Sequence, residues 1–153
     1  MSVFYRGLSQ WQSAPPDNPQ HLQSALLNFA RQHGKPVMIA ESSPQGFNIG
    51  KLTSSTIQQF DPQSVSAEDI WQTWYQPFFD FIYANRDIIR AVAYINTHWE
   101  SQPMWHCALY SKAGTDDCAN GYWGDARVQA NPDIKQRWLE HSLDDNIWVQ
   151  ATQ

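Results

Sequence analysis

Residues 35–41 read KPVMIAE, an apolar run that ends abruptly at a carboxylate. A continuous apolar run of this length predicts a strand that is buried on both faces, as in a parallel sheet covered by helices. Pro36 stops any preceding helix, so the strand begins at that point. The sequence therefore places Glu41 at the carboxyl end of a buried strand.

Strands and helices alternate on either side of this run. We expect strands over residues 2–5, 36–41 and 88–95 and helices that begin at Pro19, Ser66 and Asn131, with Pro77 kinking or splitting the second helix. The polar stretch 42–65 shows no periodicity and is expected to be a loop, and loops of that length are usually functional. Such alternation predicts parallel βα units.

Three βα units are too few for a closed barrel, which typically needs about 250 residues. They would leave two open sheet edges with apolar faces. At 153 residues the chain is long enough for one domain, and we expect a single domain over residues 1–153. The sequence therefore predicts an incomplete α/β unit whose edges something else covers.

Charge and hydropathy argue against several classes of partner. The formal net charge is −5 and no Lys/Arg-rich stripe exists, so we expect no nucleic-acid partner. No apolar run approaches the roughly 20 residues of a spanning helix, so we expect no membrane segment.

Cys107 and Cys118 either close a disulfide loop in a secreted protein or stay two thiols in a cytosolic one. Their spacing from His98 and His106 is not a recognised zinc pattern, so we expect no metal site.

Aromatic residues are frequent, with eight Trp, six Tyr and seven Phe. Aromatic faces pack cores, and they also stack on the apolar faces of sugar rings. Ligands of parallel α/β sheets bind at the carboxyl ends of the strands. Here those ends carry Tyr5, Glu41 and residues 96–100. An ionised carboxylate on a rigid strand end, between aromatic walls, is what nucleophilic attack on a glycosidic bond requires.

Three segments carry a resemblance to a known group of enzymes. The run KPVMIAE resembles the seventh strand of clan-A glycoside hydrolases, which ends in the catalytic nucleophile. Residues 91–96, AVAYIN, followed by Trp99, resemble the eighth strand, whose tryptophan forms the floor of the −1 subsite. The segments WESQPMW at 99–105 and WGDARV at 123–128 are most similar to family 26, which contains β-mannanases and related endo-β-glucanases. The resemblance covers almost the whole chain.

The resemblance implies a role for each of several residues. Glu41 would be the nucleophile of a retaining hydrolase, Tyr5 would hydrogen-bond to it, and Trp99 would stack against the −1 sugar, with Trp105 as a further substrate-binding residue. The clan's general acid/base is a Glu, usually preceded by Asn, at the end of the fourth strand, and this sequence has no such segment. Glu100 follows a neighbouring strand, but the clan pattern gives it no catalytic role.

The long loop before the last helix has structural interpretations as well. We expect Asp125 and Arg127 to form an ion pair that organises this loop. Trp105 and Trp123 either bind sugar or pack the loop.

The fold that the resemblance implies is α/β, a partial (β/α)8 barrel of about three βα units equivalent to strands 6–8. The implied function is retaining hydrolysis of a β-linked polysaccharide of the mannan or β-glucan type, without any cofactor. Because the acid/base is missing, we expect the chain to be an incomplete enzyme that is inactive alone.

Two alternatives remain open: a non-catalytic carbohydrate-binding module that uses the same aromatic platform, and a truncated fragment without a function. The exposed barrel edges predict self-association, with a homodimer covering the sheet. The sequence leaves the compartment undecided, and secretion is favoured if a longer parent protein carries a signal peptide.

Overall fold

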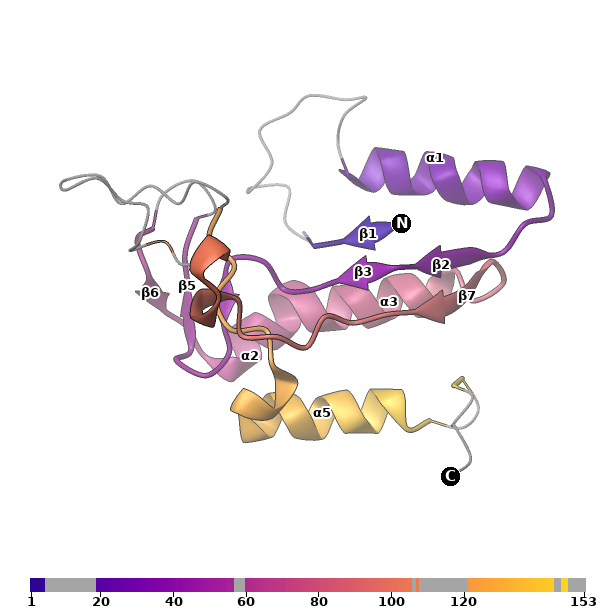
Figure 1. The fold of residues 1–153 in the computed structure, drawn as a ribbon. Helices are drawn as coiled ribbons and strands as arrows, with labels where there is room; N and C mark the ends of the chain where they lie inside the picture. The colour runs from indigo at the N-terminus through magenta and orange to yellow at the C-terminus, as the bar shows by residue number, and fades with distance from the viewer. Residues whose placement is uncertain (5–18, 57–59, 106, 108–120, 145–146, 149–153) are drawn as a thin grey trace.

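A computed structural model of the chain describes residues 1–4, 19–56, 60–105, 107, 121–144 and 147–148. Figure 1 shows short parallel strands in the middle, flanked by helices that run in the opposite direction. The long helices are α1 (Pro19–Gln32), α3 (Gln76–Ala84) and α5 (Pro132–Ser142). The carboxyl ends of the strands meet at one end of the molecule, where the connecting loops gather.

The parallel strands pair around one central stretch of chain. It contains β2 (Val37–Ile39) and β3 (Glu41–Ser42). On one side β1 (Ser2–Val3) pairs with β3, and on the other side β7 (Ile89–Val92) pairs with β2, both in parallel. The N-terminal strand thus lies beside the end of the central stretch, which carries Glu41.

Backbone hydrogen bonds extend the pairing past the ends of these short strands. The Ala93 amide donates to the Ile39 carbonyl, and the Ile95 amide donates to the Ser42 carbonyl, each at 2.8 Å. The regular strand β7 is therefore shorter than the run 88–95 that the sequence predicts, although the chain keeps its contact with the central stretch up to Ile95.

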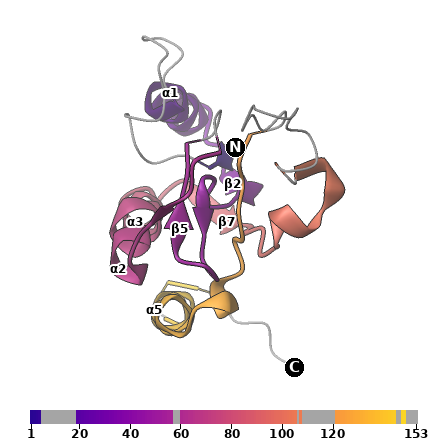
Figure 2. The same cartoon turned by 90° about the vertical axis from the view of Figure 1, so that its left-hand side faces the viewer.

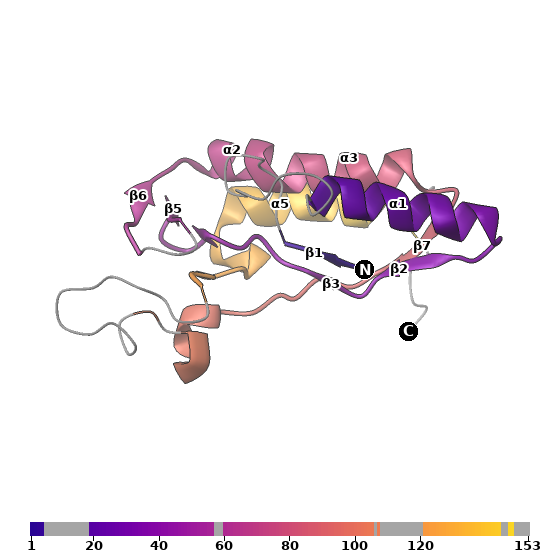
Figure 3. The ribbon, with the colours of Figure 1, turned by 90° about the horizontal axis from the view of Figure 1, so that it is seen from above.

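Helices cover only one face of the strands. Seen end-on in Figure 2 and from above in Figure 3, α1, α3 and α5 follow an arc along that face. The strand residues that point towards the helices are buried: Val3, Val37, Ile39 and Ile89. Met38, between two of them, is 51% exposed on the opposite face. The expectation that residues 36–41 are buried on both faces is therefore wrong, because no described segment covers the second face.

The first helix, α1, begins where the sequence predicts, but the periodic apolar positions Leu22, Leu26 and Phe29 are exposed rather than buried. Leu27 and Ala30 are buried against the strands. Gly34, with φ of +60°, follows the helix, and the Lys35 amide donates to the Ala30 carbonyl at 3.0 Å. A left-handed residue after the last turn is a common way to end a helix, and glycine adopts it most readily. The chain then turns back into β2.

The second helical stretch begins with a capping box. The Asp69 amide donates to the Ser66 hydroxyl at 3.0 Å, and the Ser66 amide donates to the Asp69 carboxylate at 2.9 Å. This start leads into α2 (Ala67–Ile70) and confirms the sequence prediction. Two orphan amides of the first turn are satisfied in this way.

A π turn, Trp71–Tyr75, joins α2 to α3. Its widened hydrogen bond runs from the Gln76 amide to the Trp71 carbonyl. Pro77 follows at once, and a proline ring inside an α-helix clashes with the carbonyl four residues earlier. The wider turn relieves that clash, so Pro77 changes the helix type at this point. The three bulky residues of the turn, Trp71, Trp74 and Tyr75, are all buried.

The stretch after Glu41 contains a small sheet that the sequence did not indicate. β4 (Phe47–Asn48), β5 (Thr53–Ser54) and β6 (Gln63–Ser64) pair in antiparallel order. Each paired segment has only two residues, which is too short for a visible alternation of apolar and polar positions. The expected loop is therefore an ordered β-structure at the carboxyl end of the strands.

The last helix, α5, is capped by Asn131. Its side-chain oxygen accepts from the amides of Asp133 at 3.0 Å and Ile134 at 3.2 Å, and Pro132 occupies the first turn. Ile134 is completely buried and Trp138 packs partly against the core. Asparagine at the cap followed by proline is the predicted start, and the structure confirms it.

The hydrophobic core lies between the helices and the strands and is largely aromatic. Its largest fully buried side chains come from the π turn and from α3: Trp74, Tyr75, Phe78 and Phe79. Within the described ranges, no helix is both long and apolar enough to cross a bilayer.

Candidate active site

Glu41 lies on the face of the strands that the helices leave bare. It pairs with Ser2 across β1 and β3, and the Ser2 hydroxyl donates to the Glu41 carboxylate at 2.9 Å. Partners in a parallel ladder share a face, and the next pair, Val3 with Ser42, is completely buried on the helix side. The carboxylate is thus exposed at the carboxyl end of the central stretch, where the sequence predicts it.

The two serines after Glu41 connect it to the neighbouring strand. The Ser42 hydroxyl donates to the Ala93 carbonyl at 2.8 Å. The Ser43 hydroxyl accepts from the indole N–H of Trp99 at 3.1 Å. Both serines are completely buried. Because buried hydroxyls with partners hold a fixed position, these bonds set the orientation of Trp99 relative to the chain that carries Glu41.

Three tryptophans from the last part of the chain form one cluster. The ring centroids of Trp99 and Trp105 lie 5.4 Å apart, and Trp123 lies 5.0 Å from Trp99 and 5.3 Å from Trp105. Phe4, at the end of β1, meets Trp123 edge-on at 5.0 Å. All four rings are half-buried. The cluster therefore joins the ends of the outer strands and keeps aromatic surface open to solvent.

Trp99 and Trp105 sit on short 3-10 turns after β7. These are η3 (Trp99–Ser101) and η4 (Pro103–Trp105). Trp105 and Trp123 pack against each other and both remain partly exposed, so packing of the loop is observed, while sugar binding by these rings stays a prediction.

The segment 122–127 lies between the loops that follow β3 and β7 and is hydrogen-bonded to both. The Ile49 amide donates to the Asp125 carbonyl and the Ala126 amide donates to the Thr97 carbonyl, each at 2.9 Å. Gly124, with φ of +68°, comes so close to the chain that an added Cβ would lie 2.0 Å from the Phe47 carbonyl oxygen. No residue with a side chain fits there without moving the backbone. This close approach fixes the backbone next to Trp123 against the loop that follows Glu41.

Asp125 and Arg127 form the ion pair that the sequence predicts. Two nitrogens of the Arg127 guanidinium donate to the Asp125 carboxylate at 2.9 and 2.8 Å, and the Arg127 amide adds a third bond at 3.1 Å. Burial of Asp125 opposes its ionisation, but the bonds from Arg127 outweigh that effect, so the pKa of the carboxyl lies below its usual range. The pair organises the loop.

Glu100 has structural partners on the loop that follows Glu41. Its carboxylate accepts from the Asn48 amide group at 2.9 Å and from the Lys51 ammonium at 3.0 Å, and His98 lies 3.8 Å away. The side chain is only 13% exposed. These bonds join the segment after β7 to the loop that follows Glu41, so Glu100 has a structural role at this contact.

A buried polar chain under the cluster was missed in the sequence. The hydroxyls of Tyr75 and Tyr94 lie 2.7 Å apart, and Tyr94 donates to the Ala126 carbonyl at 2.5 Å. Trp74 donates its indole N–H to the Phe4 carbonyl at 2.8 Å. Burial raises the pKa of both phenols, which keeps them protonated as donors. The π turn thus supports the ends of the two outer parallel strands, β1 through Trp74 and β7 through Tyr75.

The remaining sequence-based expectations concern Tyr5, the histidines and the cysteines. Tyr5 and His106 lie outside the described residues. Within the described part of the chain, no group of three or more His, Cys, Asp or Glu side chains could hold a metal ion. Cys107 is disulfide-bonded, which decides for the bonded alternative, and the other cysteine of the sequence, Cys118, lies outside the described residues.

Sequence comparison finds relatives of the chain that are named as β-1,3-xylanases. A β-1,3-xylanase of a Vibrio species is 40% identical to the chain over 140 residues. A β-1,3-xylanase of an Alcaligenes species is 39% identical over 140 residues. The chain is homologous to β-1,3-xylanases. In both cases the match covers 90% of this chain and 28% of the relative.

The chain therefore spans little more than a quarter of the length of the β-1,3-xylanases that it matches. No protein-family model matches it. The β-1,3-xylanase relatives support the resemblance to glycoside hydrolases, whereas the assignment to family 26 stays a prediction.

Proposed function

We propose that the chain is the nucleophile-bearing part of a β-1,3-xylanase-type glycoside hydrolase. The observation that carries the proposal is the position of Glu41: an exposed carboxylate at the carboxyl end of a parallel strand, with Trp99 bonded to the residue two positions later. The relatives' names favour β-1,3-linked xylan over the mannan or β-glucan expected from the sequence.

Glu41 attacks the anomeric carbon of the bound sugar in this mechanism. The leaving oxygen takes a proton from a general acid, and a covalent glycosyl-enzyme forms, which water then hydrolyses. The Ser2 hydroxyl donates to the carboxylate and orients it, and the tryptophan cluster forms an apolar wall for the sugar ring. The reaction needs no cofactor.

The second carboxyl group, which acts as the general acid, must come from a residue outside the site described above. Retaining hydrolysis needs two carboxyl groups about 5–5.5 Å apart. Glu100 already interacts with Lys51 and Asn48. General acid catalysis is worth about 10²–10⁴-fold, so the chain alone releases no sugar from β-1,3-xylan.

The proposed fold context is a (β/α)8 barrel of which this chain supplies the last three strands. Three parallel strands with helices on one face, and chemistry at their carboxyl ends, fit that architecture. In this arrangement the bare face that carries Met38 and Glu41 points to the barrel interior.

A chimeric enzyme tests the proposal. The chain replaces the matched region of the Vibrio β-1,3-xylanase, and reducing sugar released from β-1,3-xylan is measured. We expect the chimera to be active, Glu41→Gln to abolish activity, and Glu100→Gln to keep most of it. Azide should restore turnover of an activated xyloside by Glu41→Gly. An active chimera in which Glu41→Gln works normally would refute the role of Glu41.

A non-catalytic sugar-binding function is the second candidate. The half-exposed cluster of Trp99, Trp105 and Trp123 favours it, because such rings bind sugars without any carboxylate. Binding of xylo-oligosaccharides by the isolated chain, with the same affinity in Glu41→Ala, together with an inactive chimera, would decide for this function. If the isolated chain binds no xylo-oligosaccharide and the chimera is inactive, the chain is a fragment without a function.

A further inference from the structure

A small group of buried residues beside the loop that follows Glu41 is separate from the main hydrophobic core. Tyr122 is 1% exposed and Cys107 is 6% exposed, and Phe60 packs partly against them. The ring centroids of Phe60 and Tyr122 lie 5.0 Å apart. These three described residues form a cluster of their own, which we call the second core.

The second core joins three segments that are far apart in the sequence. Phe60 lies in the connection between β5 and β6, Cys107 follows η4, and Tyr122 begins the segment 122–127. Cys107 is also disulfide-bonded, and a cross-link restricts the conformations that are open to the chain around it. The small antiparallel sheet is thereby connected to the end of the long loop that precedes α5.

Each of the two buried members of the second core is a near neighbour of a tryptophan in the cluster. Cys107 comes two positions after Trp105, and Tyr122 directly precedes Trp123. The rings of Trp105 and Trp123 contact each other, with centroids 5.3 Å apart. Tyr122 is buried in the second core, whereas Trp123 is half-buried in the cluster. The second core therefore anchors the backbone that carries these two rings.

The third ring of the cluster, Trp99, has a different support. Its indole donates to Ser43 at 3.1 Å, and Ser43 lies two positions after Glu41 on the same stretch of chain. The cluster thus has two supports, one on the chain that carries Glu41 and one in the second core. A ring that is bonded to the chain of the nucleophile suits the sugar that reacts. Rings that are held separately suit a neighbouring sugar of the same polysaccharide.

The phenol of Tyr122 is fixed as well as its ring. Burial raises its pKa, and the charge of the Glu100 carboxylate raises it further, so the phenol stays protonated beside Glu100. The same carboxylate accepts from Asn48 and Lys51 on the loop that follows Glu41. Both ends of the Tyr122 side chain therefore have fixed surroundings, which suits a residue that sets the position of the next one, Trp123.

We propose that Tyr122 and Cys107 are positioning residues, which hold Trp105 and Trp123 through the second core against a xylose unit next to the one that reacts at Glu41. Both tryptophans keep part of their surface open to solvent, and aromatic faces stack on the apolar faces of sugar rings. Loss of the second core then weakens binding of a xylo-oligosaccharide but leaves attack on a short activated xyloside unchanged. The inference rests on the proposed function, since that function identifies the ligand and the reacting carboxylate.

The test measures binding in the chimera with the Vibrio β-1,3-xylanase. The chimera carries Glu41→Gln, so that a β-1,3-linked xylo-oligosaccharide stays intact, and calorimetry gives the dissociation constant. We expect Tyr122→Leu and Cys107→Val each to raise the dissociation constant about tenfold, the effect of losing one well-packed contact. Tyr122→Phe keeps the ring in the second core, so it should bind nearly as tightly as the unsubstituted chimera.

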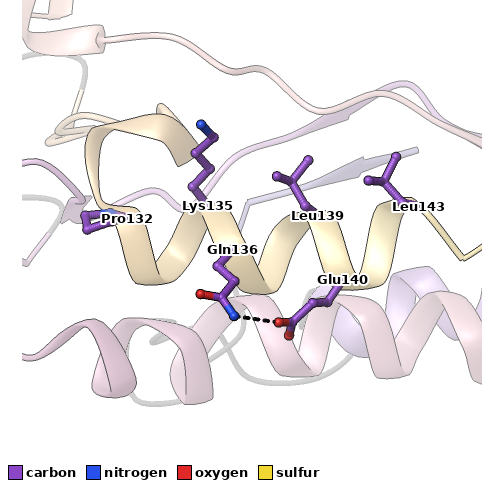
Figure 4. Close-up of a pocket in the computed structure, with 6 residues that line it drawn as sticks. All are labelled: Pro132, Lys135, Gln136, Leu139, Glu140 and Leu143. Carbon is purple, nitrogen blue, oxygen red and sulfur yellow. Dashed lines mark hydrogen bonds between the residues drawn. The ribbon is translucent and has the colours of Figure 1, made fainter.

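One milder variant and two controls complete the series. Phe60→Leu weakens the second core from its third segment, and it should change affinity in the same direction if the other variants fold poorly. Ile134→Val removes buried packing from α5, and Leu139→Ala removes an apolar side chain that projects from the same helix (Figure 4). Neither residue belongs to the second core or to the tryptophan cluster, so both controls should keep their affinity.

A kinetic measurement separates positioning of a neighbouring sugar from general damage to the site. In the chimera with Glu41 intact, the core variants should raise KM for β-1,3-xylan. For an aryl xyloside, which occupies only the site of the reacting sugar, kcat should stay within about twofold. A fall of kcat on the aryl xyloside to the same extent as on xylan would overturn the inference, because the second core would then support the reacting sugar.

The binding outcomes are equally distinct. Weaker binding in the core variants with unchanged controls supports the inference, and near-ultraviolet circular dichroism should then show an altered tryptophan signal in a folded protein. Unchanged affinity in folded core variants, an equal loss in the controls, or no binding by the chimera overturns it. Weaker binding by the core variants of a chimera that cleaves no xylan refutes only the proposed function. Normal cleavage with unchanged affinity in those variants refutes only this inference.

Discussion

Replacing Gly124 by alanine should destabilise the chain far more than the same change at Gly34. Both glycines have positive φ, +68° and +60°, so alanine at either position costs about 1–2 kcal/mol for the left-handed conformation. At Gly34 an added Cβ meets nothing within 4 Å. At Gly124 it would lie 2.0 Å from the Phe47 carbonyl oxygen, and backbone displacement of that kind costs about 1–3 kcal/mol more. We expect a loss of about 2–5 kcal/mol for Gly124→Ala.

Urea unfolding followed by far-ultraviolet circular dichroism measures both losses. The near-ultraviolet spectrum of the native state reports on the tryptophan cluster, and it should change in Gly124→Ala but not in Gly34→Ala, because Gly124 adjoins Trp123. Equal losses of stability in the two variants, or an unchanged aromatic spectrum in Gly124→Ala, would refute the close approach of residues 122–127 to the loop after β3.

Three further predictions concern the groups that support the site. Tyr94→Phe should cost more stability than Tyr75→Phe, because it removes both bonds of the hydroxyl chain and each buried group left without a partner costs about 1–3 kcal/mol; urea unfolding at pH 7 checks the order. The pKa of Asp125 is lowered in the folded state, so its stabilising effect is present above about pH 4 and is lost as the pH falls through the folded pKa. Below about pH 4 the wild-type chain should lose stability more steeply than Asp125→Asn as the pH falls, and parallel curves would contradict this. Ser43→Ala removes the acceptor for the Trp99 indole, so it should cost about 0.5–1.5 kcal/mol and shift the tryptophan fluorescence.

The helices could be predicted from local signals. The capping pair Ser66–Asp69 and the cap at Asn131 start their helices as expected, and Gly34 follows the first one. These signals depend on neighbouring residues in the chain, so the sequence carries them directly. The π turn before Pro77 could not be predicted. Proline shows that the helix must change, but the packing of Trp74 and Tyr75 on distant segments decides how.

The site could be predicted in part. Glu41 at a strand end follows from the apolar run before it, and the structure confirms that position. Its connection to Trp99 through Ser43 could not be found, because a serine gives no periodic signal and the bond spans 56 positions. The tyrosine chain was missed for the same reason, since both tyrosines fit the apolar pattern of their elements. Gly124 did carry a signal, a glycine between a tryptophan and an aspartate, which the close approach to Phe47 explains.

The role of Glu41 is the central claim, and trapping of the covalent intermediate tests it most directly. The chimera with the Vibrio β-1,3-xylanase is incubated with a 2-fluoro xyloside carrying a good leaving group, which forms the glycosyl-enzyme and then hydrolyses slowly. Peptide mass spectrometry locates the added sugar. We predict one sugar per protein, attached to the peptide that contains Glu41, and no label in Glu41→Gln. A label on another carboxylate such as Glu100, or turnover with inverted anomeric configuration and no label, would contradict the account.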